Sequence, residues 1–82
     1  MAVLHGGLLL YKEEAIGSID GYNDTFLASF QFIPGTLRVH LNGLEQNSPA
    51  DYIELDSQTI KFVNPPLGGI DSDVVTLTYQ RA

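Results

Sequence analysis

The segment from Pro34 to Gln46 reads PGTLRVHLNGLEQ and sets the kind of fold that the chain can form. Within this segment, polar and apolar side chains alternate from Thr36 to Leu41. Successive side chains of an extended strand point to opposite faces, so this period of two places the apolar set inward and the polar set in solvent. The alternation predicts a half-buried antiparallel strand over 36–42, with His40 on its outward face.

Turn residues bound this strand on both sides. Asn42-Gly43 is the strongest local signal, because a two-residue type I′ turn needs positive φ at both central positions and these two residues adopt it most readily. We expect this turn to fold residues 44–46 back on residues 39–41. Pro34-Gly35 predicts a tight corner before the strand, because proline sets φ at the first central position of the turn.

The rest of the chain carries the same kind of turn signals. Glycine, proline, asparagine and aspartate recur at short intervals, and no interval is long enough for an uninterrupted helix. Strands are expected over residues 7–13, 25–33, 36–42, 44–47, 50–55, 58–63 and 73–80. The inward positions outside the first segment are expected to hold Phe26, Ala28, Phe30, Phe32, Ile60, Phe62, Val75, Leu77 and Tyr79. About seven short strands predict an all-β fold, either a small antiparallel Ig-like β-sandwich or a small barrel, with an N-terminal arm.

Residues 1–16 form this arm or first strand, and residues 17–82 are expected to form a single β-sandwich domain. Leu8, Leu9 and Leu10 are consecutive, so a strand at this position would be apolar on both faces. Two interpretations stay open. The segment is a central strand of its own sandwich, or it packs on a neighbouring subunit and adds its edge to another sheet. The second interpretation predicts that deletion of the arm changes assembly.

The charge balance argues against two classes of partner. The chain of 82 residues has 10 Asp and Glu against 4 Lys and Arg, which gives a net charge of -6. Nucleic acid and anionic membrane surfaces both need clustered cations for binding, so neither is expected as a partner. The apolar start of the chain is broken by glycine and is far shorter than the roughly 20 residues that span a bilayer, so we expect neither a signal peptide nor a membrane anchor.

Few residues are arranged for catalysis or metal binding. The only histidines are His5 and His40, and neither has a nearby carboxylate in the sequence to orient it, although Asp51 or Glu54 could lie across the sheet from His40. Calcium takes six to eight oxygen ligands. The two acidic turns, at 20–24 and 71–73, each supply too few. The side chains of the first turn, at Asp20-Gly21 and Asn23, are expected to bond their own backbone instead. We predict no catalytic residue, no cofactor and no metal.

Two longer motifs and several short ones resemble a small β domain that is widespread in the virion proteins of tailed phages. In that family the pattern reads roughly G-x-I-D-G-x-N-x-x-F, then P-G-x-L-x-V-x-L-N-G-x-x-Q, then D-Y, I-x-F, P and Y. The corresponding segments here are Gly17–Phe26, Pro34–Gln46, Asp51-Tyr52, Ile60–Phe62, Pro65-Pro66 and Leu77–Tyr79. The matches follow the family's order along most of the chain.

The resemblance implies a non-enzymatic structural protein of the phage virion that self-associates and attaches to a larger particle. The collar or neck, the tail fibre and the decorated capsid are the positions that such domains occupy. The expected partners are copies of this chain and other virion proteins. The alternative is a recognition module that binds a glycan or receptor on the host surface. From the residues themselves, the side chains expected at an interface are Leu8, Leu9, Leu10, Tyr11, Tyr22 and His40.

Overall fold

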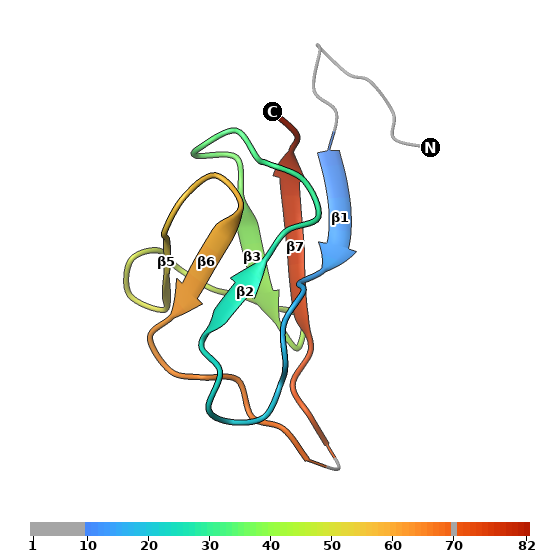
Figure 1. The fold of residues 1–82 in the computed structure, drawn as a ribbon, viewed down its shortest axis with the longest axis vertical. Helices are drawn as coiled ribbons and strands as arrows, with labels where there is room; N and C mark the ends of the chain where they lie inside the picture. Colours follow the sequence, from blue (N-terminus) through green and yellow to red (C-terminus); the bar gives the residue numbers. More distant parts are fainter. Residues whose placement is uncertain (1–9, 70) are drawn as a thin grey trace.

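The computed structural model of the chain describes residues 10–69 and 71–82, and these residues form two antiparallel β-sheets (Figure 1). The strands are β1 (Leu10–Glu14), β2 (Thr25–Leu27), β3 (Arg38–Leu41), β4 (Leu44–Glu45), β5 (Tyr52–Glu54), β6 (Thr59–Phe62) and β7 (Val75–Gln80). One sheet has the strand order β1-β7-β3-β4, and the other has the order β2-β6-β5. The described residues contain no helix, so the prediction of a small all-β sandwich is confirmed.

The β3–β4 hairpin turns at Asn42-Gly43, where the sequence predicts it. Asn42 has a φ of 53° and Gly43 has a φ of 84°, the two positive values that a type I′ turn requires. Beyond the turn, the backbone N–H of Gln46 donates to the carbonyl of Val39 at 2.8 Å, which continues the pairing past the end of β4. The local turn chemistry therefore fixes the register of this hairpin.

The corner at Pro34-Gly35 also forms, and it is tied to the end of β7. Gly35 has a φ of 87°, and the N–H of Thr36 donates to the carbonyl of Ile33 at 3.1 Å, as in a turn with positive φ at its third residue. The Thr36 hydroxyl donates to the same carbonyl at 2.6 Å and accepts a hydrogen bond from the N–H of Gln80 at 3.2 Å. The corner is thus held against the sheet at the point where β3 begins.

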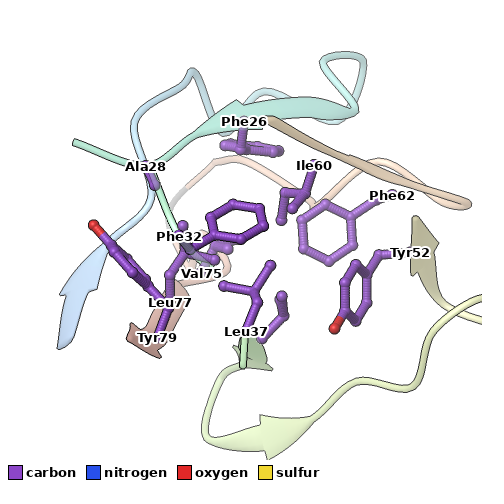
Figure 2. Packing of buried hydrophobic residues seen from close by; sticks show 11 residues of the cluster. Phe26, Ala28, Phe32, Leu37, Tyr52, Ile60, Phe62, Val75, Leu77 and Tyr79 are labelled. Carbon is purple, nitrogen blue, oxygen red and sulfur yellow. The ribbon is translucent and has the colours of Figure 1, made fainter. Parts of the chain in front are cut away.

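The core lies between the two sheets and takes inward side chains from both (Figure 2). Its buried members are Phe26, Ala28, Phe32, Leu37, Val39, Tyr52, Ile60, Phe62, Val75, Leu77 and Tyr79. Within the smaller sheet, the rings of Phe26 and Phe62 meet edge to face with centroids 5.6 Å apart. The rings of Phe32 and Tyr79 lie 5.9 Å apart against the larger sheet. Burial of this apolar cluster is the main favourable contribution to the fold.

β1 is an edge strand of the chain's own sheet. Its five residues pair with β7 in an antiparallel register that runs from Leu10 opposite Gln80 to Glu14 opposite Thr76. The first-strand interpretation therefore describes residues 10–14, although the strand lies at the edge of the sheet and not at its centre. Just after β1 the chain reaches the second sheet, where Ile16 and Leu27 exchange two backbone hydrogen bonds of 2.8 and 2.9 Å.

The predicted strand over 25–33 is wrong beyond residue 27. β2 ends at Leu27 because the chain then crosses from the smaller sheet to the larger one, where Phe32 forms an isolated bridge with Arg81. The crossing breaks the period of two, so Phe30 is 37% exposed instead of buried. Its ring packs edge to face on Tyr11 at 5.4 Å, and the Arg81 guanidinium lies 3.6 Å from its centroid. β1 ends at Glu14, one residue beyond its predicted range of 7–13, and the five strands after β2 form within their predicted ranges with shorter bounds.

Candidate functional site

The outer face of the four-stranded sheet carries polar side chains in cross-strand rows. Lys12 of β1 and Arg38 of β3 both lie opposite Thr78 of β7, so two of the chain's four cations flank one threonine. In the next row, His40 lies opposite Thr76. Because strand side chains alternate between faces, these residues share the face that points away from the core.

Part of this face is hollowed into a depression with a volume of about 440 Å³. Its lining consists of Leu10, Gly35, Thr36, Arg38, His40, Thr78 and Gln80. We call it the outer-sheet depression. No carboxylate is among these lining residues, whereas the guanidinium, the imidazole and the amide all offer N–H donors. The depression therefore suits a ligand that presents hydrogen-bond acceptors or negative charge.

His40 faces a different carboxylate from those that the sequence suggested. Its cross-strand partner on the hairpin is Glu45 of β4. The suggestion that Asp51 or Glu54 could lie across the sheet from His40 is wrong, because β4 lies beside β3 in this sheet and β5 belongs to the other one. The prediction failed because it depended on the order of strands in space, which local turn signals do not determine.

Tyr22 is presented by an ordered loop between β1 and β2, which we call the Tyr22 loop (residues 18–24). The carboxylate Oδ1 of Asp20 accepts hydrogen bonds from the N–H of Tyr22 at 2.9 Å and of Asn23 at 2.8 Å. These two bonds, the one from Asn23 first, lower the pKa of the Asp20 carboxyl below its ordinary value. The N–H of Gly21 donates to the carbonyl of Pro66 at 2.9 Å, which fixes the loop to the segment after β6.

In the second acidic turn, the Asp73 carboxylate likewise accepts hydrogen bonds from groups of its own chain. The side-chain amide of Asn42 donates to Asp73 Oδ1 at 2.8 Å, and the N–H of Leu67 donates to Asp73 Oδ2 at 2.8 Å. These bonds, the one from Asn42 first, lower the pKa of the Asp73 carboxyl. Asn42 in turn accepts from the N–H of Val74 at 2.8 Å. Within residues 10–69 and 71–82, no group of three or more histidine, aspartate and glutamate side chains is placed to hold a metal ion.

Glu13 forms a polar cluster that the sequence analysis missed. Although β1 is an edge strand, the Glu13 side chain points inward, where its carboxylate accepts hydrogen bonds from the backbone N–H of Ser29 at 2.9 Å, from the Ser29 hydroxyl and from the Tyr79 hydroxyl. Burial raises the pKa of the Glu13 carboxyl, but the bonds from Ser29 and Tyr79 outweigh it, so the pKa lies below its ordinary value. Burial, and then the bond to Glu13, raise the pKa of the Tyr79 hydroxyl.

Of the remaining predicted interface residues, Leu10 and Tyr11 lie in different environments. Leu10 is 52% exposed and lines the outer-sheet depression together with His40. Tyr11 is half-buried and packs on the aromatic side chains of its own chain. Leu8 and Leu9 lie outside the described residues. The structure thus brings two of the predicted residues together, and it places the Tyr22 loop elsewhere.

The outer face of the three-stranded sheet exposes aliphatic side chains that were not among the predicted interface residues. Leu27, Ile53 and Val63 expose 43%, 39% and 58% of their surface there, and we call these three residues the apolar face. Polar side chains share this face, since Lys61 pairs with Ile53 and with Thr25, and Thr59 pairs with Leu27. Most single aliphatic residues on a surface need no explanation, but Ile53 and Val63 line one shallow depression and Leu27 lies on the same sheet face, which indicates a contact surface.

A signal for the apolar face was present in the sequence. Each of its members directly follows a buried aromatic residue, in the pairs Phe26-Leu27, Tyr52-Ile53 and Phe62-Val63. Two consecutive large apolar residues in a strand place one side chain on each face. Such pairs in three neighbouring segments therefore predict aliphatic side chains on the outer face of this sheet as well as in the core.

No family model, curated protein sequence or solved structure matches the chain. In the part of the chain that the structure describes, there is no helix of the length and hydropathy that a membrane span requires. The resemblance to the phage virion domain stays a prediction.

Proposed function

We propose that this protein is a non-enzymatic structural subunit of a phage virion, which self-associates and attaches to a larger particle. The observation that carries this proposal is the apolar face of the three-stranded sheet. In a small acidic domain, three large aliphatic side chains on one sheet face favour association over an isolated existence in solution. Attachment to a larger particle follows from such a surface.

The energetics of the apolar face fit a subunit that binds at many sites at once. Burial of the exposed part of one half-exposed aliphatic side chain contributes roughly 1 kcal/mol. One such face cannot alone offset the translational and rotational freedom that association removes, which is several kcal/mol. Repeated contacts around a symmetric particle raise the total affinity far above that of a single contact, which is the way virion subunits gain strength.

Two further features support assembly. β1 is a sheet edge whose outward backbone groups are free to accept another strand in the part of the chain that the structure describes. The net charge of -6 keeps separate copies soluble before they meet a partner. The placement in a virion, with other virion proteins as partners, rests on the resemblance of the turn motifs.

The test is the mass of the native chain in solution, measured by light scattering on a sizing column. The full chain is compared with a shortened chain that starts at Leu10, so that β1 stays intact. We expect a defined oligomer for the full chain. A smaller mass for the shortened chain would assign the contact to residues 1–9. A monomer for both chains at high concentration would contradict self-association and leave only attachment to another virion protein.

A recognition module for a host glycan or receptor is the second candidate. The exposed Tyr22 on an ordered loop favours it, because tyrosine rings stack on sugar faces and combine apolar area with a polar hydroxyl. Screening of the isolated protein against a panel of bacterial surface sugars separates the two candidates. Saturable binding of one sugar by a monomer would favour recognition over assembly.

A further inference from the structure

The Tyr22 loop has the properties of a binding element. Tyr22 is 88% exposed, more than any other large hydrophobic side chain in the described residues. Its backbone is held by Asp20 on one side and by the bond from Gly21 to Pro66 on the other. A tyrosine on an ordered loop loses little conformational freedom when it binds, because only two side-chain torsions must be fixed. Such tyrosines are frequent among the few residues that dominate binding energy.

Charge complementarity links this loop with the outer-sheet depression. The Asp20 carboxylate is bonded to the backbone of Tyr22 and is exposed, so a surface that receives the ring also meets this negative charge. Arg38 lines the depression, and Lys12 lies in the same cross-strand row. No acidic residue lines it, and the nearest cross-strand carboxylates, Glu45 opposite His40 and Glu14 opposite Thr76, belong to the next row. A guanidinium can stack on an aromatic ring and can also bond a carboxylate with its planar fork.

The volume of the depression and its unused hydrogen-bond donors fit the side chains of the Tyr22 loop. About 440 Å³ is within the range of clefts that hold a ligand larger than one side chain. Leu10 gives it apolar area for the ring. The Thr36 hydroxyl is already bonded to Ile33 and Gln80, so the remaining donors belong to Arg38 and the other lining side chains.

The loop and the depression lie at opposite ends of the molecule. The depression surrounds Leu10 and Gln80, where β1 begins and β7 ends. In Figure 1, the backbone of residues 18–24 lies at the other end of the sheets, below the point where β1 ends, and is separated along the longest axis from the start of β1 and the end of β7. This axis measures 40 Å. One molecule cannot place its own loop in its own depression, so the contact needs a second copy.

We propose that the Tyr22 loop of one copy docks into the outer-sheet depression of the next copy, in a head-to-tail contact. This inference rests on the proposed self-association and names the two surfaces that carry it. Such a contact joins different surfaces of the two copies, so it closes into a ring when the rotation between neighbours allows it and otherwise extends as a filament. The apolar face takes no part in it and stays available for the larger particle.

The test uses two full-length variants, Tyr22→Ser and Arg38→Glu, each of which removes one half of the contact. Both side chains are exposed, and circular dichroism checks that the fold is kept. Each variant alone is expected to associate at least about tenfold more weakly than the original chain. An equimolar mixture is expected to form one-to-one complexes and nothing larger, because each variant keeps the surface that the other lacks. Sedimentation velocity over a range of concentrations measures both effects.

Matched controls lie on the apolar face. Val63→Ser removes an exposed aliphatic side chain, and Lys61→Glu makes a change of charge like that of Arg38→Glu. Both are expected to leave self-association unchanged. If these controls dissociate the oligomer while Tyr22→Ser does not, the head-to-tail contact is wrong and the proposed self-association stands through another surface.

Three other results would also overturn the contact. Variants that dissociate singly but do not recombine in the mixture would exclude the head-to-tail pairing of the two surfaces. A chain that stays monomeric at every concentration would contradict both this contact and the proposed self-association. A monomer in which glucuronic acid shifts the NMR signals of Arg38 and His40 would assign the depression to an acidic sugar instead.

Discussion

At the scale of single residues, Glu13 decides how the edge of the larger sheet is held. A carboxylate that points inward from an edge strand is tolerated only when donors surround it, and Ser29 and Tyr79 supply them here. The bond ties β1 to the segment that crosses between the sheets. It also gives the fully buried Tyr79 ring an acceptor for its hydroxyl.

Removal of this carboxylate is expected to destabilise the fold. Glu13→Ala leaves the Tyr79 hydroxyl and the Ser29 N–H without their acceptor, which costs about 1–3 kcal/mol of unfolding free energy. Urea denaturation at neutral pH measures the loss as a lower midpoint with an unchanged slope. Glu14→Ala, the next residue on the solvent side of the same strand, is the control and is expected to change stability by less than about 0.5 kcal/mol. Equal losses for the two variants would contradict this role of Glu13.

Because of the Glu13 carboxylate, the unfolding free energy is expected to depend on pH. Because the pKa of Glu13 is lower in the folded chain than its ordinary value of 4.5, its contribution is complete above that value and is lost as the pH falls through the folded pKa. The difference in unfolding free energy between the original chain and Glu13→Gln is therefore expected to be constant near neutral pH and to shrink below pH 4.5. Urea titrations at several pH values measure it. A difference that grows in acid would refute the assignment.

At the scale of elements, the hairpin and the corner could be predicted because their causes are local. Asn42-Gly43 and Pro34-Gly35 carry their turn geometry in the residues themselves, and the alternation between them gives the strand. The crossing after Leu27 could not be predicted in the same way. Its position depends on backbone bonds to distant partners, such as that from Ala28 to Gln58, and the bonds between Glu13 and Ser29 have the same long-range character.

The geometry of the hairpin turn determines how much stability each substitution of Gly43 is expected to cost. Its φ of 84° is favourable for glycine and strained for residues with a Cβ, although an added Cβ there would meet no atom within 4 Å. Gly43→Ala is therefore expected to cost about 1 kcal/mol from the backbone alone. Gly43→Asn is expected to cost less, because asparagine adopts positive φ more readily. Thermal unfolding of both variants tests this order, and a larger loss for asparagine would be inconsistent with a backbone cause.

Substitution of Gly68 is expected to lower the stability more than substitution of Gly43, for a different reason. A Cβ at this position would lie 2.4 Å from the carbonyl oxygen of Ile19 and 2.9 Å from Cα of Asp20, and both are backbone atoms that cannot give way by rotating a side chain. Gly68→Ala is expected to destabilise the fold by about 1–3 kcal/mol and to disturb the Tyr22 loop that it contacts. Amide NMR spectra locate the change, and shifts that spare residues 18–24 would show that the loop and Gly68 are independent.

At the scale of the whole molecule, the outer faces of the two sheets differ in the side chains that they expose. The four-stranded sheet is polar and hollowed, with Arg38 in the depression, while the three-stranded sheet exposes Leu27, Ile53 and Val63. The fold class could be predicted from turn spacing and alternation. The sites could not, because the depression combines side chains from the corner and three strands whose order in space no local pattern gives.

The fold is expected to depend on β1. A chain that starts at Gly17 would lack the strand that pairs along β7, the Tyr11 ring that packs on Tyr79, and the carboxylate of Glu13. Domains of this size hold only about 5–15 kcal/mol of net stability, and burial of one aromatic side chain alone supplies roughly 1.5–3 kcal/mol. We expect this chain to lose its near-UV circular dichroism and its cooperative thermal transition, while the chain that starts at Leu10 keeps both. A cooperative transition in the Gly17 chain would mean that residues 17–82 fold alone and that β1 is an accessory arm.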